Sequence, residues 1–561
     1  MRWLPLIICI LSFSSAQAQL LGTAKSYDRS DTLRGSIGEH RAWWDVTYYD
    51  ISVTPDIPNR SITGTTIIAF TSIDAGQRMQ IDLQRPLEID SIFIAVSVFK
   101  DGMMSIEDRP VGFTREEDVV WIDLPEPMPS GEANTIRIHY HGKPKIAKNA
   151  PWDGGWVWSQ DKNGDPWISV ACQGLGASVW YPCKDHQSDE PDDGASLHIT
   201  VPQDLVAVGN GRLRSKNTNS DGSVTWTWGV QNTINTYNII PYIGKYVSFG
   251  GTIGGQIAPI DAEYWVLQQD LEKAKEHFKM VPPMIGCFEK MIGPYPWYGD
   301  GFKLVQAPYL GMEHQSAIAY GNGFVNGYRG MDLSRSGHGK DWDYIIVHEA
   351  AHEWFGNSIT TADIADMWVQ EGFTVYSEVA YVECIKGAQA ANEYMIGMRS
   401  NIVNDRPVIG PYGVNEEGSG DMYYKGAAVI HMVRAMMNDD ERFWRMFRDL
   451  YDEFKYSIVT SAQVEEFMDE WIDADLRIFF DQYLRTTRVP KLEWRIVNRR
   501  LSYRWSGTLP GFNMPVDVSI DGGTIRIQPT TEWQELDRKM NKRTRIVVDP
   551  RYYVTSGKVA R

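Results

Sequence analysis

The chain has 561 residues, more than one ordinary hydrophobic core accommodates, and this length predicts about two to four domains. Hydrophobic residues make up 43%, aromatic residues 12% and charged residues 23% of the chain, a balance that excludes a disordered protein. The formal net charge of −17 argues against nucleic acid as a partner, because phosphate binding needs a positive field.

The first residues have the pattern of a secretory signal peptide. Arg2 precedes an apolar run at residues 4–13, and Ala16-Gln17-Ala18 follows as a small-x-small cleavage site. Cleavage after Ala18 would leave residues 19–40 as an N-terminal extension and place the mature protein in the periplasm or outside the cell. The apolar run is too short to span a bilayer and no comparable run recurs, so no membrane span is expected. An uncleaved anchor is the alternative.

Residues 41–250 are predicted to form a β domain. Trp44 and Val46 alternate with polar neighbours, and the alternation resumes one residue out of phase at Tyr49, Ile51 and Val53. This shift predicts a strand with a bulge. Further strands, separated by Gly- and Asp-containing breaks, are expected at 62–73, 136–140, 195–201 and 223–228.

Residues 251–488 are predicted to be mainly helical, and residues 489–561 to form a small β domain. We expect Pro282-Pro283 to interrupt the helical pattern that starts at 270. Helices are predicted at 270–280, 341–357, 366–386 and 424–438, and strands at 492–497, 501–505, 524–528 and 544–548.

Four cysteines remain after the signal peptide: Cys172, Cys183, Cys287 and Cys384. They are too few and too scattered for a disulfide scaffold, and no CxxC pair indicates a metal site. A Cys172–Cys183 bridge is compatible with a secreted protein, but packing is the expected role for most of the four.

The stretch HEAAHEWFGN places two histidines four residues apart. On a helix, His348 and His352 would share one face and could bind one ion, with Glu349 bordering the same site. Zinc suits such nitrogen donors. Two histidines on the surface of an amphipathic helix are the alternative.

A catalytic zinc site needs a third protein ligand. Glu371, in DMWVQEGFTVYSE, follows on a second predicted helix and can approach from there. Glu378 lies seven residues further on the same face, where its carboxylate can hold a ligand histidine by the other ring nitrogen. A solvated helix residue is the alternative for Glu378.

HEAAHEWFGN followed by WVQEGFTVYSE resembles the aminopeptidase N family of gluzincin zinc aminopeptidases, which also includes leukotriene hydrolase. The pattern of that family is HExxHxWFGN and then WxxEGF. The resemblance implies that His348, His352 and Glu371 bind one Zn²⁺ per chain and that Glu349 is the general base. Gln370 stands where the family typically has Asn.

The upstream stretch APYLGMEHQSAIAYG resembles the GxMEN element of the same family. Its backbone pairs with an extended peptide, and its glutamate binds the free α-amine. Gly311, Met312 and Glu313 keep the core of the element and are implied to bind substrate. Leu310 and His314 replace the first glycine and the asparagine, so the path of the backbone stays open. Without the resemblance, Glu313 would be interpreted as a solvated strand residue.

Two further stretches match the family. GDMYYKGAAVIHMV resembles its YxKGA element, which implies that the hydroxyl of Tyr423 donates to the oxyanion of the reaction, while Tyr424 begins the helix and packs. A core aromatic is the alternative for Tyr423. In ACQGLGASVWYPCKD, Gln173 matches a glutamine that helps to hold the substrate amine; an ordinary loop glutamine is the alternative.

The resemblance covers residues 40–490 and implies an α+β multidomain fold. The expected parts are an N-terminal β saddle or sandwich, a thermolysin-like, mainly helical catalytic domain and a small C-terminal β-sandwich. Many members add a long helical C-terminal domain over the active site, for which this chain, ending at Arg561, has no room. We therefore expect a short form whose site is open or is covered by a second subunit in a homodimer.

The resemblance implies a zinc-dependent aminopeptidase that hydrolyses the N-terminal peptide bond of peptides with a free α-amine, through zinc-bound water and a glutamate base. A secreted thermolysin-like endopeptidase would share the zinc site but has no need of Glu313. An epoxide hydrolase like leukotriene hydrolase uses the same zinc, but a secretory signal gives no reason to expect its lipid substrate. A non-catalytic peptide-binding module would be expected to have lost Glu349 or a ligand.

Overall fold

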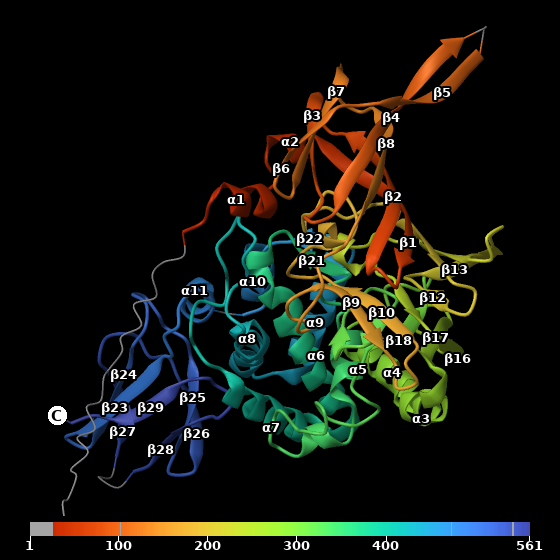
Figure 1. The fold of residues 1–561 in the computed structure, drawn as a ribbon. Coiled ribbons are helices and arrows are strands. Elements are labelled where there is room, and N and C mark those ends of the chain that lie inside the picture. The colour runs from red at the N-terminus through yellow and green to blue at the C-terminus, as the bar shows by residue number, and fades with distance from the viewer. Residues whose placement is uncertain (1–25, 101–102, 473, 541–543, 561) are drawn as a thin grey trace, which may run out of the picture.

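The structure is a computed structural model that describes residues 26–100, 103–472, 474–540 and 544–560, so the predicted signal peptide lies outside the described residues. Figure 1 shows β strands at the top in red and orange, helices at the centre in green and teal, and a second group of strands in blue. The predicted three-part α+β fold is confirmed. Among the described residues, no helix combines the length and the apolar character needed to cross a membrane.

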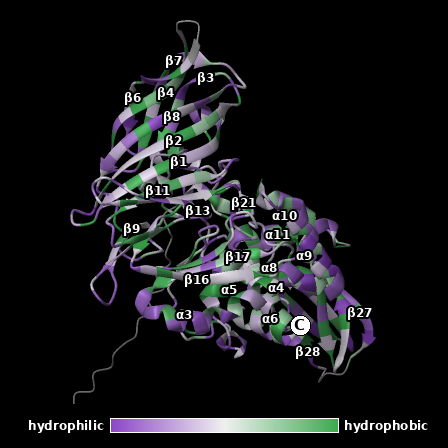
Figure 2. Ribbon diagram, turned by 90° about the vertical axis from the view of Figure 1, so that its right-hand side faces the viewer, coloured by the Kyte–Doolittle hydropathy of each residue, from purple (hydrophilic) through white to green (hydrophobic). Residues whose placement is uncertain are grey.

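An eight-stranded sheet dominates the N-terminal β region, in the order β13-β14-β11-β1-β2-β8-β4-β5. Its register shifts between Val46 and Tyr48, where β1 pairs with β2. The next buried side chain after Val46 is therefore Tyr49 and not Tyr48. The predicted bulge is confirmed. Figure 2 shows the underlying alternation as green and purple bands along these strands. The strands are β1 (Trp44–Asp56), β2 (Ser61–Ser72), β4 (Glu88–Lys100), β5 (Met103–Pro110), β8 (Ala133–Gly142), β11 (Ala195–Val201), β13 (Arg212–Thr218) and β14 (Val224–Val230).

Two smaller sheets and two short helices complete this region. The helices α1 (Arg29–Gly35) and α2 (Glu39–Ala42) precede the first strand. The smaller sheets contain β3 (Gly76–Asp82), β7 (Val119–Met128) and β6 (Phe113–Glu116), and β12 (Val206–Val208), β15 (Tyr242–Gly244), β10 (Pro166–Ala171) and β9 (Gly155–Gln160). Two 3-10 turns, η1 (Ala177–Val179) and η2 (Thr236–Asn238), lie in the connections.

A five-stranded sheet joins the N-terminal β region to the helices. Its order is β16-β17-β18-β20-β19, so β19 forms one edge. Side chains alternate between two cores, since Tyr264 and Val266 pack among the helices while Trp265 and Leu267 pack against the N-terminal strands. The strands are β16 (Tyr246–Ile253), β17 (Ile260–Leu267), β18 (Phe302–Gln306), β19 (Gly311–Met312) and β20 (Ile318–Tyr320).

The helix predicted at 366–386 is confirmed as α6 (Trp368–Lys386), whereas the predicted bounds of α5 (Tyr344–Ala351) and α8 (Asp421–Met437) need correction. The helical pattern is interrupted before Pro282-Pro283, because α3 (Leu271–His277) ends in a 3-10 turn, and the two prolines then lie in the first turn of α4 (Val281–Met291), where a missing N–H costs no intrahelical bond. Helix α5 ends at Ala351, six residues before the predicted end at Asn357. The chain continues in turns, and Gly356, with φ 123°, has a backbone conformation that is incompatible with an α-helix. Helix α8 begins at Asp421, whose N–H is accepted by the Ser419 hydroxyl.

These helices are α3 (Leu271–His277), α4 (Val281–Met291), α5 (Tyr344–Ala351), α6 (Trp368–Lys386), α7 (Ala388–Met398), α8 (Asp421–Met437), α9 (Asp440–Phe454), α10 (Ser461–Glu470) and α11 (Arg477–Leu484). Short 3-10 turns lie at η3 (Gln268–Asp270), η4 (Phe278–Met280), η5 (His338–Lys340), η6 (Ile364–Asp366) and η7 (Arg399–Asn401), and β21 (Ile359–Thr361) pairs with β22 (Ser457–Val459).

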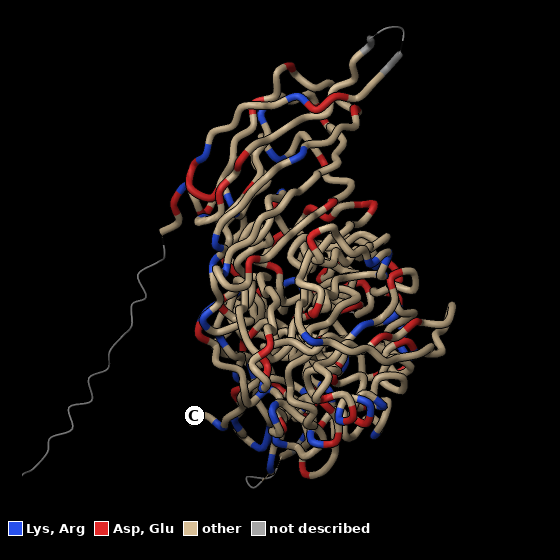
Figure 3. The backbone as a smooth tube through the Cα atoms, turned by 45° about the vertical axis from the view of Figure 1, so that its right-hand side comes forward, with Lys and Arg blue, Asp and Glu red and all other residues tan. Residues whose placement is uncertain are grey.

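Two sheets form the C-terminal part, and the four predicted strands are confirmed as β23, β24, β26 and β28. The sheets are β27 (Gln534–Lys539), β24 (Arg500–Ser506), β23 (Lys491–Val497) and β29 (Thr555–Lys558), and β26 (Gly523–Ile527), β25 (Val516–Ile520) and β28 (Ile546–Val548). Their apolar residues belong to the same buried cluster as the helices. The boundaries at residues 250 and 488 stay predictions. Figure 3 shows acidic and basic residues interspersed along all three parts.

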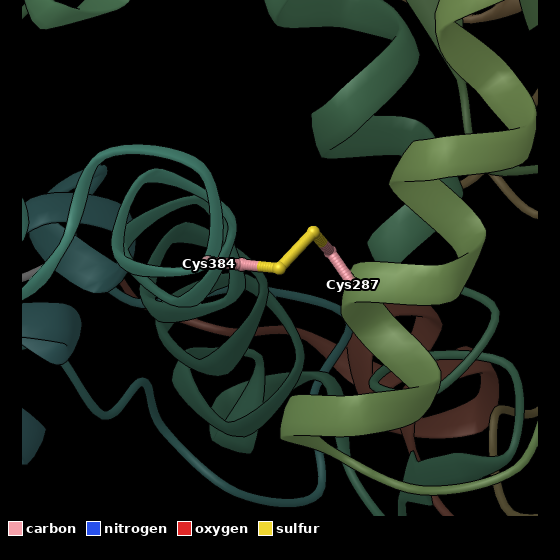
Figure 4. The surroundings of a disulfide bond; sticks show 2 residues. All are labelled: Cys287 and Cys384. Atoms are coloured by element: carbon pink, nitrogen blue, oxygen red, sulfur yellow. A yellow bond between two sulfur atoms is a disulfide. The ribbon is translucent and has the colours of Figure 1, made fainter.

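The predicted packing role is confirmed for Cys172 and Cys183 and is wrong for Cys287 and Cys384. Cys172 and Cys183 are buried and free, each with its own packing contacts; the thiol of Cys172 donates to the Tyr237 carbonyl at 3.5 Å. Cys287 on α4 and Cys384 on α6 form the disulfide instead, with Cα atoms 5.9 Å apart, as Figure 4 shows. The bridge fastens α4 to the helix that carries Glu371.

Candidate metal centre and amine-binding site

Helices α5 and α6 bring the three predicted metal ligands together. His348 lies on α5, His352 directly follows its last residue, and Glu371 lies in the first turn of α6. One ligand atom from each lies within 4.8 Å of the others, and all three side chains are buried. Asp343 starts α5 by accepting hydrogen bonds from the N–H groups of residues 345 and 346.

Hydrogen bonds orient both histidines toward Glu371. Nδ1 of His348 lies 2.7 Å from Oε1 of Glu378, and Nδ1 of His352 lies 2.9 Å from the carbonyl oxygen of Phe355. Each Nδ1–H therefore donates to an oxygen, and each Nε2 keeps a lone pair for a metal. These Nε2 atoms lie 3.6 Å (His348) and 3.2 Å (His352) from Oε2 of Glu371.

Glu371 supplies an acceptor that fits a cation. Its Oε1 accepts a hydrogen bond from the hydroxyl of Tyr423 at 2.9 Å, whereas its buried Oε2 has no hydrogen-bond partner among the described residues. A buried carboxylate oxygen without a donor is costly unless a positive charge meets it. Two imidazole nitrogens and this oxygen form a donor set that suits Zn²⁺.

Glu378 accepts a hydrogen bond from Nδ1 of His348, so it holds one of the ligand histidines, as predicted. It is fully buried, and its second oxygen accepts a hydrogen bond from Tyr394 at 2.6 Å. Tyr394, which lies on α7, was not predicted from the sequence, and neither was the Phe355 carbonyl that orients His352. No motif spacing connects Tyr394 to the metal ligands.

Glu349 lines the same cleft as the three predicted metal ligands, and the backbone of Gly311 passes very close to its carboxylate. A Cβ atom on Gly311 would lie 2.6 Å from Oε1 of Glu349 and 2.7 Å from Cγ2 of Ile345, so only glycine fits without displacement. Burial raises the pKa of Glu349 to about 8, against the lowering effect of the His348 imidazole. A bound cation would oppose the rise, because it stabilises the carboxylate.

Glu313 lies beside this group, immediately after β19. One of its oxygens lies within 4.8 Å of ligand atoms of Glu349 and His352. Its Oε1 accepts hydrogen bonds from Nε2 of Gln173 and from the hydroxyl of Tyr237 at 2.9 Å. The implied contact of Gln173 with a substrate amine stays a prediction. Tyr237 was missed, because it lies in the N-terminal β region, far from any recognised motif.

The two residues that differ from the family's GxMEN element flank β19 in the chain, Leu310 before it and His314 after it. Leu310 lines the cavity, whereas His314 is fully buried with Nδ1 2.7 Å from the hydroxyl of Tyr242. Burial lowers the pKa of His314 to about 3, so its imidazole is neutral at physiological pH. The backbone path left open by the sequence is an edge strand that pairs antiparallel with β20.

Tyr423 and Tyr424 both lie in the first turn of α8, so Tyr424 does not begin the helix. The Tyr423 ring centroid lies 6.0 Å from that of His348. Tyr424 packs against the helical core and also lines the cavity, which the sequence did not predict.

One cleft of about 810 Å³ is lined by the three predicted metal ligands and by Glu349, Glu313, Gln173 and Tyr423. The cleft lies where the N-terminal β region, the edge of the five-stranded sheet and the helices meet. Its walls come from residues 151–153 and 173–175, from β19, from α5, α6 and α8, and from the segment 406–420.

Comparison with known proteins agrees with this geometry. Residues 46–238 match the peptidase M1 N-terminal domain, and residues 279–483 match the peptidase family M1 domain. Aminopeptidase B of Mus musculus is 24% identical over 350 residues, which are 58% of this chain and 50% of that protein. Aminopeptidase N of Bos taurus is 25% identical over 332 residues, 54% of this chain and 33% of that protein. The matches therefore span about half or less of these relatives.

Solved structures show the same fold. An M1 zinc metallopeptidase mutant of Deinococcus radiodurans, bound to a Tyr-Ser-Ala substrate, matches with a TM-score of 0.63 and 18% identity over 80% of this chain and 95% of that one. A two-domain M1 zinc metallopeptidase mutant bound to L-tryptophan matches with a TM-score of 0.63 and 19% identity, over 78% of this chain and 93% of the other. With both M1 models matched in order over most of its length, the chain belongs to peptidase family M1.

Proposed function

We propose that the chain is a zinc-dependent aminopeptidase, which removes the first residue of peptides with a free α-amine. The observation that carries the proposal is the buried carboxylate of Glu313, within 4.8 Å of ligand atoms of Glu349 and His352. An ammonium group paired with Glu313 makes a charge-assisted hydrogen bond. Because successive carbonyl groups of an extended peptide are roughly 3.5 Å apart, a fixed amine selects the first peptide bond for the metal.

A bound metal would contribute in two ways. Zn²⁺ held by His348, His352 and Glu371 would act as a Lewis acid toward the scissile carbonyl and lower the pKa of water in its open position. Glu378 keeps the His348 ring in the orientation that this binding needs.

The remaining chemistry belongs to protein side chains. Glu349 accepts a proton from the attacking water and passes it to the leaving amine. Tyr423, whose hydroxyl already lies beside the ligand Glu371, donates to the oxyanion that develops on the carbonyl. Gln173 holds Oε1 of Glu313 and assists amine binding.

The substrate backbone has a matching surface. Strand β19 is at the edge of its sheet and pairs with β20 on one side, so an extended peptide can add to the other side. Gly311 lets this peptide approach Glu349, because the glycine leaves space where a side chain would collide. The same edge leads directly into Glu313.

Two substitutions separate these roles. Glu349→Gln should retain one zinc per chain and lower kcat by about 10²–10⁴-fold, since only proton transfer is lost. Glu313→Ala should retain zinc and raise KM for free-amine substrates by about 10–100-fold, because a charged hydrogen bond is lost. Normal turnover in the first variant, or an unchanged KM in the second, would contradict these assignments.

We also propose that residues 1–18 are a cleaved signal peptide and that the mature protein is periplasmic or secreted. The Cys287–Cys384 disulfide supports an oxidising compartment. N-terminal sequencing of the mature protein should begin at residue 19; an intact Met1 would contradict cleavage.

A homodimer that covers the cleft is a separate proposal. The solution mass tests it, because a monomer at working concentrations would contradict it.

A further inference from the structure

Two hydrogen bonds converge on one oxygen of Glu313. Oε1 accepts from Gln173 and from Tyr237, and both donors belong to the N-terminal β region. Among the described residues, both side-chain donors to this carboxylate bond Oε1, and its other hydrogen bond comes from the main-chain N–H of Glu313 itself. The carboxylate is therefore fixed at one oxygen and available at the other, although its side chain is only 3% exposed.

Tyr237 belongs to a short turn that is itself firmly held. The turn is η2, Thr236–Asn238, and the side chain of Asn235 accepts a hydrogen bond from the Tyr237 N–H. The hydroxyl of Tyr181 donates to the Thr236 carbonyl at 2.9 Å. Because its backbone is held from two sides, the turn can direct the Tyr237 hydroxyl at a fixed point.

The same turn also reaches the main chain of Glu313. Nδ2 of Asn238 donates to Oδ1 of Asn357 at 2.8 Å, and Nδ2 of Asn357 donates to the Glu313 carbonyl at 2.8 Å. Asn357 ends the HEAAHEWFGN stretch that carries two of the three predicted metal ligands, His348 and His352. One turn of the N-terminal region thus supports the side chain of Glu313 directly and its backbone through one intermediary.

We propose that the turn Thr236–Asn238 is a positioning element for amine recognition, in which Tyr237 holds Glu313 so that Oε2 meets the substrate ammonium. The proposal rests on the aminopeptidase function proposed above. A carboxylate anchored at one oxygen has lost its rotational freedom before substrate binds, so binding does not have to order it. Tyr237 is a positioning residue, because it contacts Glu313 and reaches the substrate through it.

The test compares Tyr237→Phe with Tyr295→Phe as a matched control. Each variant loses one buried hydroxyl that donates a hydrogen bond, but the Tyr295 hydroxyl donates to the Gly301 carbonyl, outside the turn, and only Tyr237 contacts Glu313. Two inhibitors serve as probes: leucine hydroxamate, which has a free amine, and N-acetyl-leucine hydroxamate, which does not. Both carry the same zinc-binding group, so their difference reports the amine site.

Tyr237→Phe should raise the Ki of leucine hydroxamate about tenfold and leave that of the acetylated inhibitor within about twofold. KM for leucine amide should rise by a similar factor, with kcat changed much less. Tyr295→Phe should leave both Ki values within about twofold. Equal weakening of both inhibitors by Tyr237→Phe, or the same behaviour in the two variants, would overturn the proposal.

A double-mutant cycle tests whether Tyr237 acts through Glu313. In a Glu313→Ala background, Tyr237→Phe should have no further effect on leucine hydroxamate; an effect that persists would show a merely structural role. If Tyr237→Phe does not fold, Asn238→Ala replaces it, with the same expected loss for the free-amine inhibitor alone. Failure of the wild-type chain to hydrolyse leucine amide would refute the proposed function, whereas normal hydrolysis with identical tyrosine variants would refute only this inference.

Discussion

Gly311→Ala tests how closely the substrate-binding strand approaches the proposed general base. The added Cβ would lie 2.6 Å from Oε1 of Glu349, whereas ordinary contacts begin at 3.4 Å. The carboxylate must therefore retreat by about 0.8 Å, since the neighbouring Ile345 methyl blocks the other direction at 2.7 Å. Displacing a reacting group by about 1 Å can cost about 10²-fold in rate, which corresponds to about 2.7 kcal/mol of barrier.

The assay measures kcat and KM on a leucine amide, together with zinc content. We expect kcat to fall about 10²-fold while one zinc per chain is retained, because Glu349 is not a ligand. Gly251→Ala on β16 is the matched control, since a Cβ there meets nothing within 4 Å and the residue lies in the same sheet. An unchanged kcat in Gly311→Ala would refute the reasoning. A raised KM with normal kcat would show that β19 moves instead of Glu349.

Three further predictions concern the metal, the disulfide and acid stability. Glu378→Gln should weaken zinc affinity about 10–100-fold, because His348 loses its carboxylate partner. Ser377→Ala on the same helix is the control and should leave zinc affinity unchanged. Equal zinc affinities of the two variants in a chelator competition would contradict this prediction. Replacing Cys287 and Cys384 by Ser should lower the free energy of unfolding by about 3–5 kcal/mol in denaturant titration, because the bridge closes a loop across 97 residues; an unchanged midpoint would contradict it. Burial lowers the pKa of His314 from 6.5 to about 3, so between these values the unfolded chain binds a proton that the folded chain does not, and stability falls as pH falls. His314→Asn should flatten the pH dependence of unfolding between pH 6.5 and 4; identical slopes would exclude this contribution.

The metal residues could be predicted because their arrangement is local. A spacing of four residues along α5 and its C-cap aligns His348 with His352, and a spacing of seven on α6 aligns Glu371 with Glu378. Helix geometry therefore nearly fixes each pair, and the packing of α5 against α6 brings the two pairs together. The bulge in β1 was equally predictable, since it shifts the alternation of buried residues by one.

Contacts between distant elements could not be predicted in this way. Tyr237 meets Glu313 across 76 residues, and Cys287 meets Cys384 across 97, because separate elements pack together. Such contacts leave no periodic signal in one sequence. The predicted end of α5 and start of α8 were wrong for a related reason. The left-handed turn at Gly356 and the hydroxyl of Ser419, which accepts from the Asp421 N–H, compete with the helical pattern around them.

The central claim is that Glu313 binds the substrate amine and so places the first peptide bond at the zinc site. The most direct measurement is the hydrolysis of one series of leucyl peptides, free and N-acetylated, by the wild-type chain with and without a chelator. We predict hydrolysis of the first bond of the free peptides, at least about tenfold slower cleavage of the acetylated ones, and loss of all activity with chelator that added zinc restores. Equal cleavage of acetylated peptides, or internal cleavage, would contradict the claim and indicate an endopeptidase.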